Sequence, residues 1–122
     1  MKENFSLLTV DQLVRRFTDV TSHQYRAVMG NDVSTYNKLY ATMSAVCQEL
    51  KSRPGDGRRN LIPLYTHQNI QVRLAAARST LALNYTPARR VIEAIANSER
   101  FPIAGDAGMT LWNLDRGVFK PT

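Results

Sequence analysis

The sequence has few of the residues on which disulfide, metal and covalent chemistry depend. Cys47 is the single cysteine among 122 residues, so no disulfide can form within the chain. The two histidines, His23 and His67, have no cysteine or carboxylate at metal-ligand spacing, and we expect no metal and no cofactor. Cys47 lies in the context SAVCQEL and is interpreted as a small core residue, not as a nucleophile.

Long hydrophobic runs and strand-like alternation are also missing. No apolar run is long enough to cross a bilayer, and the N-terminal stretch MKENFSLLTVDQL has no continuous apolar region before Asp11. We therefore expect a cytoplasmic protein without membrane contact. No segment alternates polar and β-branched residues as a half-buried strand does, which leaves an all-α fold in one domain over residues 1–122.

Acidic residues are scarce in the middle of the chain. The whole sequence has 16 Lys and Arg against 10 Asp and Glu, a net charge of +6. Residues 51–100 hold nine of the basic residues and three of the acidic ones, so the entire excess lies in this segment. Such a segment indicates an acidic partner, either an acidic protein or nucleic acid.

Apolar periodicity and capping residues predict a series of helix pairs. Thr9 and Gln12 form a capping-box sequence before a long amphipathic helix, and Asp32 is placed to cap the next helix. The two helices make a hairpin over residues 9–53, which ends at the loop SRPGDGRRN.

Two further helix pairs are expected after this loop. Their predicted ranges are 57–83, with helices at about 57–66 and 69–83, and 86–116. Thr86 is the expected N-cap of the second pair, with Pro87 at the first helical position, and Gly117 and Pro121 stop the last helix.

The two pairs repeat one another with an offset of 30 residues. The offset aligns Arg59 with Arg89, Ile62 with Ile92, Ala77 with Ala107, Thr80 with Thr110 and Leu81 with Leu111. Helix pairs that cannot bury their apolar faces alone stack on their neighbours, as in an α-solenoid. We therefore expect about six helices in three antiparallel layers, with the N-terminal hairpin as one of the layers.

The stretch LIPLYTHQNIQVRLAAARSTLAL resembles a HEAT repeat, with an internal proline, Pro63, in its first helix and a polar corner around His67. Residues 57–83 match well and residues 86–114 weakly. Through YNKLY, ELKSRPGD, HQNIQVRLAAA and AGDAGMTLWNLDRGVFKPT, the whole chain is similar to a small bacterial family recorded only as a domain of unknown function. The resemblance implies a HEAT- or armadillo-like right-handed α-α superhelix, a bacterial origin and no enzymatic activity. In HEAT repeats the arginine that Arg73 matches commonly ties one repeat to the next.

The arginine doublets are the clearest candidates for contact with a partner. They are Arg58 and Arg59 in the first turn of the helix predicted at 57–66, and Arg89 and Arg90 at the matched place in the next repeat. Cations there oppose the helix dipole by roughly a few tenths of a kcal/mol, so helix stability does not explain them. Along one solenoid edge they would form a basic ridge that grips phosphates or carboxylates. Alternatively, they pair with Asp56, Glu93 and Glu99 or are solvated. Arg78 completes the set of candidate partner-binding residues.

The stretch AGDAGMTLWNLDRG, residues 104–117, suggests a site at first sight. Gly105 and Gly108 are too close for a phosphate-binding loop, and no lysine follows them. Asp106 and Asp115 are nine residues apart, so on one straight helix they point about 180° away from each other. A catalytic pair of carboxylates is therefore not expected.

Packing explains this stretch better than catalysis does. Gly105 aligns with Ala75 as a small residue in a close helix contact, and Trp112 is interpreted as the terminal core residue. Gly108 aligns with Arg78 and has no evident packing reason, which hints at a cavity or a partner surface.

The sequence favours a non-enzymatic protein-interaction module that binds an acidic partner through its basic edge and its second-helix face. The alternative is a nucleic-acid-binding HEAT-like protein, because a related architecture serves in some bacterial DNA-repair glycosylases. Against this alternative, aromatic residues do not interleave with the arginines. An enzyme acting on a small molecule is least favoured, since no acid-base pair or nucleophile can be named.

Overall fold

The computed structural model describes residues 3–122, which form helices and connecting loops without a strand. In chain order the helices are η1 (Phe5–Leu7), α1 (Val10–Met29), α2 (Val33–Ser52), η2 (Gly57–Thr66), α3 (Ile70–Thr80), α4 (Tyr85–Ala96) and α5 (Ile103–Asp115), where η marks a 3-10 helix. The prediction of an all-α fold with about six helices is confirmed. None of the helices in the described range is both long and apolar enough to cross a membrane. Met1 and Lys2, which begin the N-terminal stretch considered above, lie outside the described residues.

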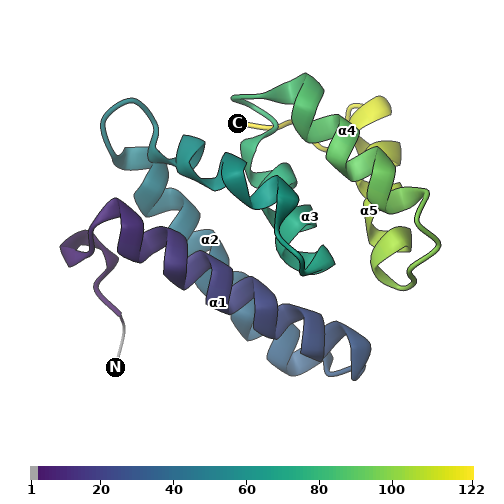
Figure 1. Ribbon diagram of the computed structural model, residues 1–122, viewed down its shortest axis with the longest axis horizontal. Helices are drawn as coiled ribbons and strands as arrows, with labels where there is room; N and C mark the ends of the chain where they lie inside the picture. The colour runs from purple at the N-terminus through teal and green to yellow at the C-terminus, as the bar shows by residue number, and fades with distance from the viewer. Residues whose placement is uncertain (1–2) are drawn as a thin grey trace.

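The first two long helices form the predicted antiparallel hairpin (Figure 1). The predicted N-caps of both helices are confirmed. The backbone N–H of Gln12 donates to Thr9 Oγ1 at 3.1 Å, and the Thr9 N–H donates to Gln12 Oε1 at 2.9 Å. At α2, the Thr35 N–H donates to Asp32 Oδ1 at 3.1 Å. These side chains accept from helix N–H groups that have no acceptor within the helix. This local requirement is why the capping residues in the sequence marked the starts of both helices.

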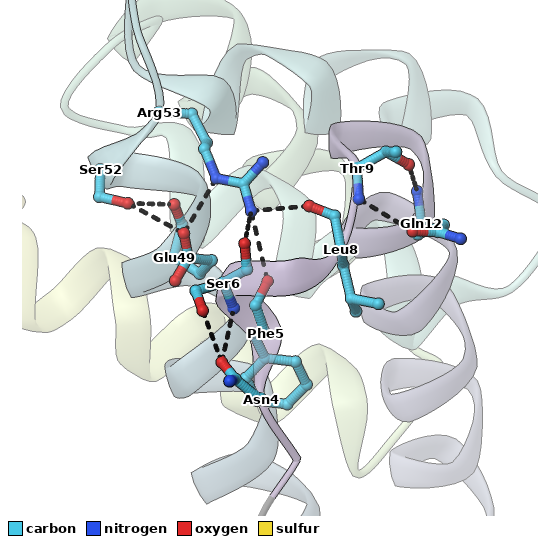
Figure 2. A network of polar contacts seen from close by, with 9 residues as sticks. All are labelled: Asn4, Phe5, Ser6, Leu8, Thr9, Gln12, Glu49, Ser52 and Arg53. Carbon is cyan, nitrogen blue, oxygen red and sulfur yellow. Dashed lines mark hydrogen bonds and ion pairs between the residues drawn. The ribbon is translucent and has the colours of Figure 1, made fainter.

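Arg53 holds the N-terminal segment against the end of α2 (Figure 2). Its Nη2 donates to the main-chain oxygens of Phe5, Ser6 and Leu8 at 3.3, 3.5 and 2.7 Å. Its Nε pairs with Glu49 Oε2 at 2.9 Å. This guanidinium therefore closes the end of the hairpin, and its charge belongs to the scaffold.

The helix η2 has 3-10 geometry and contains Pro63. Proline has no N–H to donate to the carbonyl one turn back, and its ring clashes with that same carbonyl, which makes a regular α-helix costly at this position. Asp56 starts the segment with a φ of 60° and accepts the Arg58 N–H at 3.2 Å. The following helix, α3, ends at Thr80, three residues earlier than predicted.

The predicted N-cap of α4 is wrong. The helix begins at Tyr85 after Asn84, so Thr86 and Pro87 lie inside its first turn. The first N–H groups of a helix have no acceptor within it, so a proline that lacks an N–H is accepted there as well as at the first position.

Two hydrophobic clusters meet at α3, which lies between the hairpin and the α4–α5 pair (Figure 1). The first cluster includes Leu13, Phe17, Val46, Leu50, Leu61, Ala75 and Ala76. The second includes Ile70, Leu74, Ala77, Ile92, Ile95, Ile103 and Ala107. α1 packs along α3 more extensively than α2 does. Space therefore remains between α2 and α3.

Candidate functional site

A cavity of about 260 Å³ fills the space between α2 and α3, and we term it the α2–α3 groove. Gln24 of α1 lies at its base. The α2 wall includes Tyr36, Tyr40, Met43 and Cys47, and the α3 wall includes Gln71, Ala75, Arg78 and Ser79. Arg58 of η2 and residues 119–122 complete the lining. Figure 1 shows the C-terminus returning past α4 toward this central part of the molecule.

The groove is lined by cations without acidic side chains. Arg58, Arg78 and Lys120 contribute positive charge, and no Asp or Glu is among the lining residues. Among residues 3–122, no ion pair involves Arg78 or Lys120. A concave surface that carries charge of one sign concentrates its field, so this groove attracts anions.

Arg58 is 8% exposed and is held by Asp56. Its Nε and Nη2 donate to the two Asp56 carboxylate oxygens at 2.9 and 2.7 Å. This hydrogen bonding raises the pKa of Arg58 and lowers the pKa of Asp56. Arg58 Nη2 also lies 3.5 Å from the main-chain oxygen of Thr122, to which Lys51 Nζ donates at 3.0 Å. Cations at this end of the groove thus already hold one main-chain oxygen.

Two buried polar atoms in the groove lining have no hydrogen-bond partner, namely Gln71 Oε1 and Arg78 Nε. Gln71 is 1% exposed, and its Nε2 donates to Gln24 Oε1 at 3.0 Å. Gln24 Nε2 is in turn directed to Met43 Sδ at 3.5 Å. Leaving a buried polar group unpaired costs about 1–3 kcal/mol, so two such groups in one groove indicate a place for a bound group.

Cys47 is the only thiol of the chain, and it lies in the α2 wall of the groove. Burial raises the pKa of the Cys47 thiol, and its Sγ lies 3.5 Å from Ser79 Oγ. A raised pKa disfavours the thiolate, which is the nucleophilic form. The side chain packs against the first hydrophobic cluster, in agreement with its interpretation as a small core residue.

Arg89 joins α4 to α5 through Asp115 and also contacts two residues of its own helix. Its Nη1 and Nη2 donate to the two oxygens of Asp115 at 2.8 and 3.2 Å, and its Nε lies 3.4 Å from Glu93 Oε2. Nη1 also donates to the Tyr85 hydroxyl at 3.1 Å. The bonds to Asp115 raise the pKa of Arg89 and lower the pKa of Asp115. They also explain an acidic residue at the C-terminal end of α5, where the helix dipole disfavours negative charge.

The five candidate arginines therefore have different surroundings. Arg58 and Arg78 both line the groove. Arg89 has carboxylate partners, and two of the pairings considered from the sequence, Arg58 with Asp56 and Arg89 with Glu93, are formed. Arg59 and Arg90 are exposed and lie outside the groove, and Arg59 Nε donates to the Gly55 oxygen at 3.2 Å.

Other groove residues were not identified from the sequence. They include Gln24, Tyr36, Tyr40, Gln71 and Lys120. One signal was available, because Gln24 continues the helical stripe of Leu13, Phe17 and Val20 and interrupts it with an amide. A polar side chain within an apolar stripe predicts a buried hydrogen bond. No local pattern marks Lys120, which reaches the groove through the path of the chain after α5.

The interpretation of Trp112 as a core residue is wrong. It is 58% exposed, and the Arg116 guanidinium lies 5.5 Å from its ring centroid. No helix within residues 3–122 follows α5 to cover this face. Gly105 is not closely packed either, because a Cβ there would lie 3.7 Å from Phe101 Cδ1, and a Cβ at Gly108 would meet nothing within 4 Å. Gly108 does not line the α2–α3 groove.

The polar corner before α3 is held by hydrogen bonds within its own helix pair. The Asn69 N–H donates to His67 Nδ1 at 3.0 Å. Arg73 Nη1 donates to the main-chain oxygens of His67 and Gln68 at 2.8 and 3.3 Å, so it fixes the corner of its own helix pair. His23 is exposed, and no group of three His, Cys, Asp or Glu in the described residues could hold a metal ion.

Comparison with known proteins gives a family but no activity. The family model described as "Domain of unknown function (DUF2019)" matches residues 11–115. The crystal structure of the protein RPA1889 from Rhodopseudomonas palustris CGA009 is 45% identical in sequence, with a TM-score of 0.93 over 99% of this chain and 100% of that chain. No curated protein matches. The expected similarity of the whole chain to a domain of unknown function is confirmed.

Proposed function

The chain belongs to the family described as a domain of unknown function (DUF2019), and we propose that it is a non-enzymatic protein-interaction module. It binds an acidic segment of a partner protein in the α2–α3 groove, on the second-helix face. One observation carries this proposal: Arg58, Arg78 and Lys120 line a cavity that has no Asp or Glu in its lining.

Tyrosines beside these cations support a protein ligand. Tyr36 and Tyr40 lie on the α2 wall with ring centroids 6.3 Å apart, and Tyr40 is 46% exposed. Tyrosine and arginine are enriched at protein interfaces, because each offers a large contact surface together with hydrogen bonding. A cavity of about 260 Å³ also has the size of a few side chains, whereas a nucleic-acid backbone requires an extended row of cations.

The chemistry of the groove supports a binding role without catalysis. Its lining has no histidine and no carboxylate side chain that could act as a general base. The raised pKa of Cys47 disfavours nucleophilic attack at neutral pH. Arg78 and Lys120 are suited to hold an anion, and no lining residue is suited to activate one.

A titration followed by amide NMR tests the proposal. ¹⁵N-labelled protein is titrated with acetyl-tetraglutamate-amide and, separately, with a short DNA duplex, at salt concentrations from about 50 to 200 mM. We expect the peptide to shift resonances of α2 and α3 around the groove. Arg78→Met should weaken this binding at least about tenfold, equivalent to about 1.4 kcal/mol.

Arg90→Met is the matched control, because it removes the same charge from an exposed position outside the groove. It should leave the peptide affinity nearly unchanged. The proposal fails if the peptide shifts no groove resonance at low salt. It also fails if only the duplex binds and the shifts surround Arg59 and Arg90.

A further inference from the structure

The two unpaired atoms of the groove belong to one face of α3. Gln71 and Arg78 are seven residues apart, which is about two helical turns, or about 10.5 Å along the axis. Both residues line the groove, and their free atoms are of opposite kinds. Gln71 Oε1 accepts a hydrogen bond and Arg78 Nε donates one. A ligand that satisfies both atoms must therefore offer a donor to Gln71 and an acceptor to Arg78.

The hydrogen bonds of Gln71 leave its oxygen for such a ligand. Gln71 Nε2 is used by Gln24 Oε1 at 3.0 Å, and Gln24 Nε2 is directed to Met43 Sδ. The side-chain amides of Gln24 and Gln71 are therefore fixed at the base of the groove, and Gln71 Oε1 remains as an acceptor. At the other point, Arg78 is in no ion pair within the described chain, whereas Arg58 is already paired with Asp56.

An extended peptide has the required chemistry and length. Roughly three residues of extended chain span 10.5 Å at about 3.3 Å per residue, and each residue carries a main-chain N–H. A single carboxylate ion accepts from Arg78, but it has no donor for Gln71 Oε1.

We propose that the α2–α3 groove binds its acidic segment as an extended chain, with a main-chain N–H on Gln71 Oε1 and an Asp or Glu carboxylate on Arg78 Nε. This inference rests on the function proposed above, and it specifies how the same groove recognises its ligand. Residues 119–122 support it, because this irregular segment lines the groove with the main-chain oxygen of Thr122 on Lys51 and Arg58. The groove therefore already contacts a non-helical segment of this chain, and the neighbouring cations bind one of its main-chain oxygens.

Replacement of the peptide amides isolates the contact with Gln71. An analogue of acetyl-tetraglutamate-amide in which esters replace the internal amides keeps every carboxylate and removes the internal N–H donors. On the unmodified protein, we expect the ester analogue to bind about fivefold to tenfold more weakly than the amide peptide. The amide peptide should also shift the side-chain Nε–H resonance of Arg78.

Gln71→Met is the complementary variant, since methionine has a similar length and no acceptor oxygen. It should bind the amide peptide and the ester analogue with equal affinity. Arg78→Met should weaken the binding of both peptides. If Gln71→Met does not fold, the comparison of the two peptides on the unmodified protein still decides the matter.

The outcomes separate this inference from the proposed function. Equal binding of both peptides with shifts in the groove overturns extended-chain recognition and leaves the acidic-segment function in place. The same holds if only water occupies the two points when the peptide is bound. If neither peptide shifts any groove resonance, the proposed function itself is overturned.

Discussion

The α2–α3 groove and the α4–α5 pair use the same residue type in opposite ways. On α4, Arg89 is bound by Asp115 and Glu93, so its charge holds two helices together. In the groove, Arg78 has no ion-pair partner within residues 3–122, and its Nε is buried without a hydrogen bond. The difference shows that the number of arginines in a segment says little about function. What matters is which of them the fold places in a groove without a carboxylate partner.

Arg58 lies between these two cases, and its replacement gives the largest expected effect. Arg58→Met keeps the length of the side chain and leaves the half-buried Asp56 carboxylate without its partner. We expect the free energy of unfolding to fall by about 2 kcal/mol, because a partly desolvated charge is left unpaired. Chemical denaturation measures this change.

A double-mutant cycle with Asp56→Asn provides the control for Arg58. Asparagine tolerates the positive φ of this position and can still cap η2, so the cycle isolates the charge interaction. A loss below about 0.5 kcal/mol in Arg58→Met would mean that Arg58 is as dispensable for folding as an exposed cation.

The pH dependence of stability sharpens the same contrast. Arg58 lowers the pKa of Asp56 below its ordinary value of 3.8, so the pair stabilises the fold above that value. Its contribution is lost as the pH falls below 3.8 and through the lower pKa of the folded state. Denaturation of the parent protein and of Asp56→Asn between pH 7 and pH 2.5 should show a shallower acid loss in the variant. Parallel curves would contradict the pairing.

Gly108 tests the difference between the packed face of α3 and the open face of α5. Ala76 and Ala77 of α3 are fully buried, whereas a Cβ at Gly108 would meet nothing within 4 Å. Gly108→Ala should therefore stabilise the protein by about 0.5–1 kcal/mol. Alanine has less conformational freedom than glycine in the unfolded chain, so it loses less entropy when the helix forms. A lower melting temperature in the variant would show that this face of α5 is crowded after all.

Asp115→Ala should have the smallest effect on stability. The carboxylate is exposed although it pairs with Arg89, and solvent and salt screen such pairs. We expect a lower melting temperature at low salt and almost no difference from the parent protein at about 1 M salt. A loss that persists at high salt would show that the Arg89 contacts hold the α4–α5 pair more firmly than an exposed ion pair does.

Sequence signals that act within one helix turn predicted the fold well. The Thr9–Gln12 capping box and the Asp32 cap are local, so they could be recognised without knowledge of the tertiary structure. Trp112 shows the limit of this approach. Its periodicity is that of a core residue, but whether a face is covered depends on the presence of a further helix.

The candidate site depended on long-range packing, and the sequence identified only part of it. Arg58 and Arg78 were candidates, but they meet because α1 packs along α3 and leaves a space beside α2. Lys120 joins them through the returning C-terminal segment, for which no helical period gives a signal. The resemblance to HEAT repeats, the acidic partner and the absence of catalysis remain predictions.

The central claim is that Arg78 is the arginine of the α2–α3 groove that the fold leaves available for an acidic ligand. The most direct test is the side-chain Nε–H resonance of Arg78 during titration with acetyl-tetraglutamate-amide at about 50 mM salt. We predict a saturable shift of this resonance that Arg90→Met does not alter. An unmoved Arg78 resonance, with shifts around Arg59 and Arg90 in its place, would contradict the account.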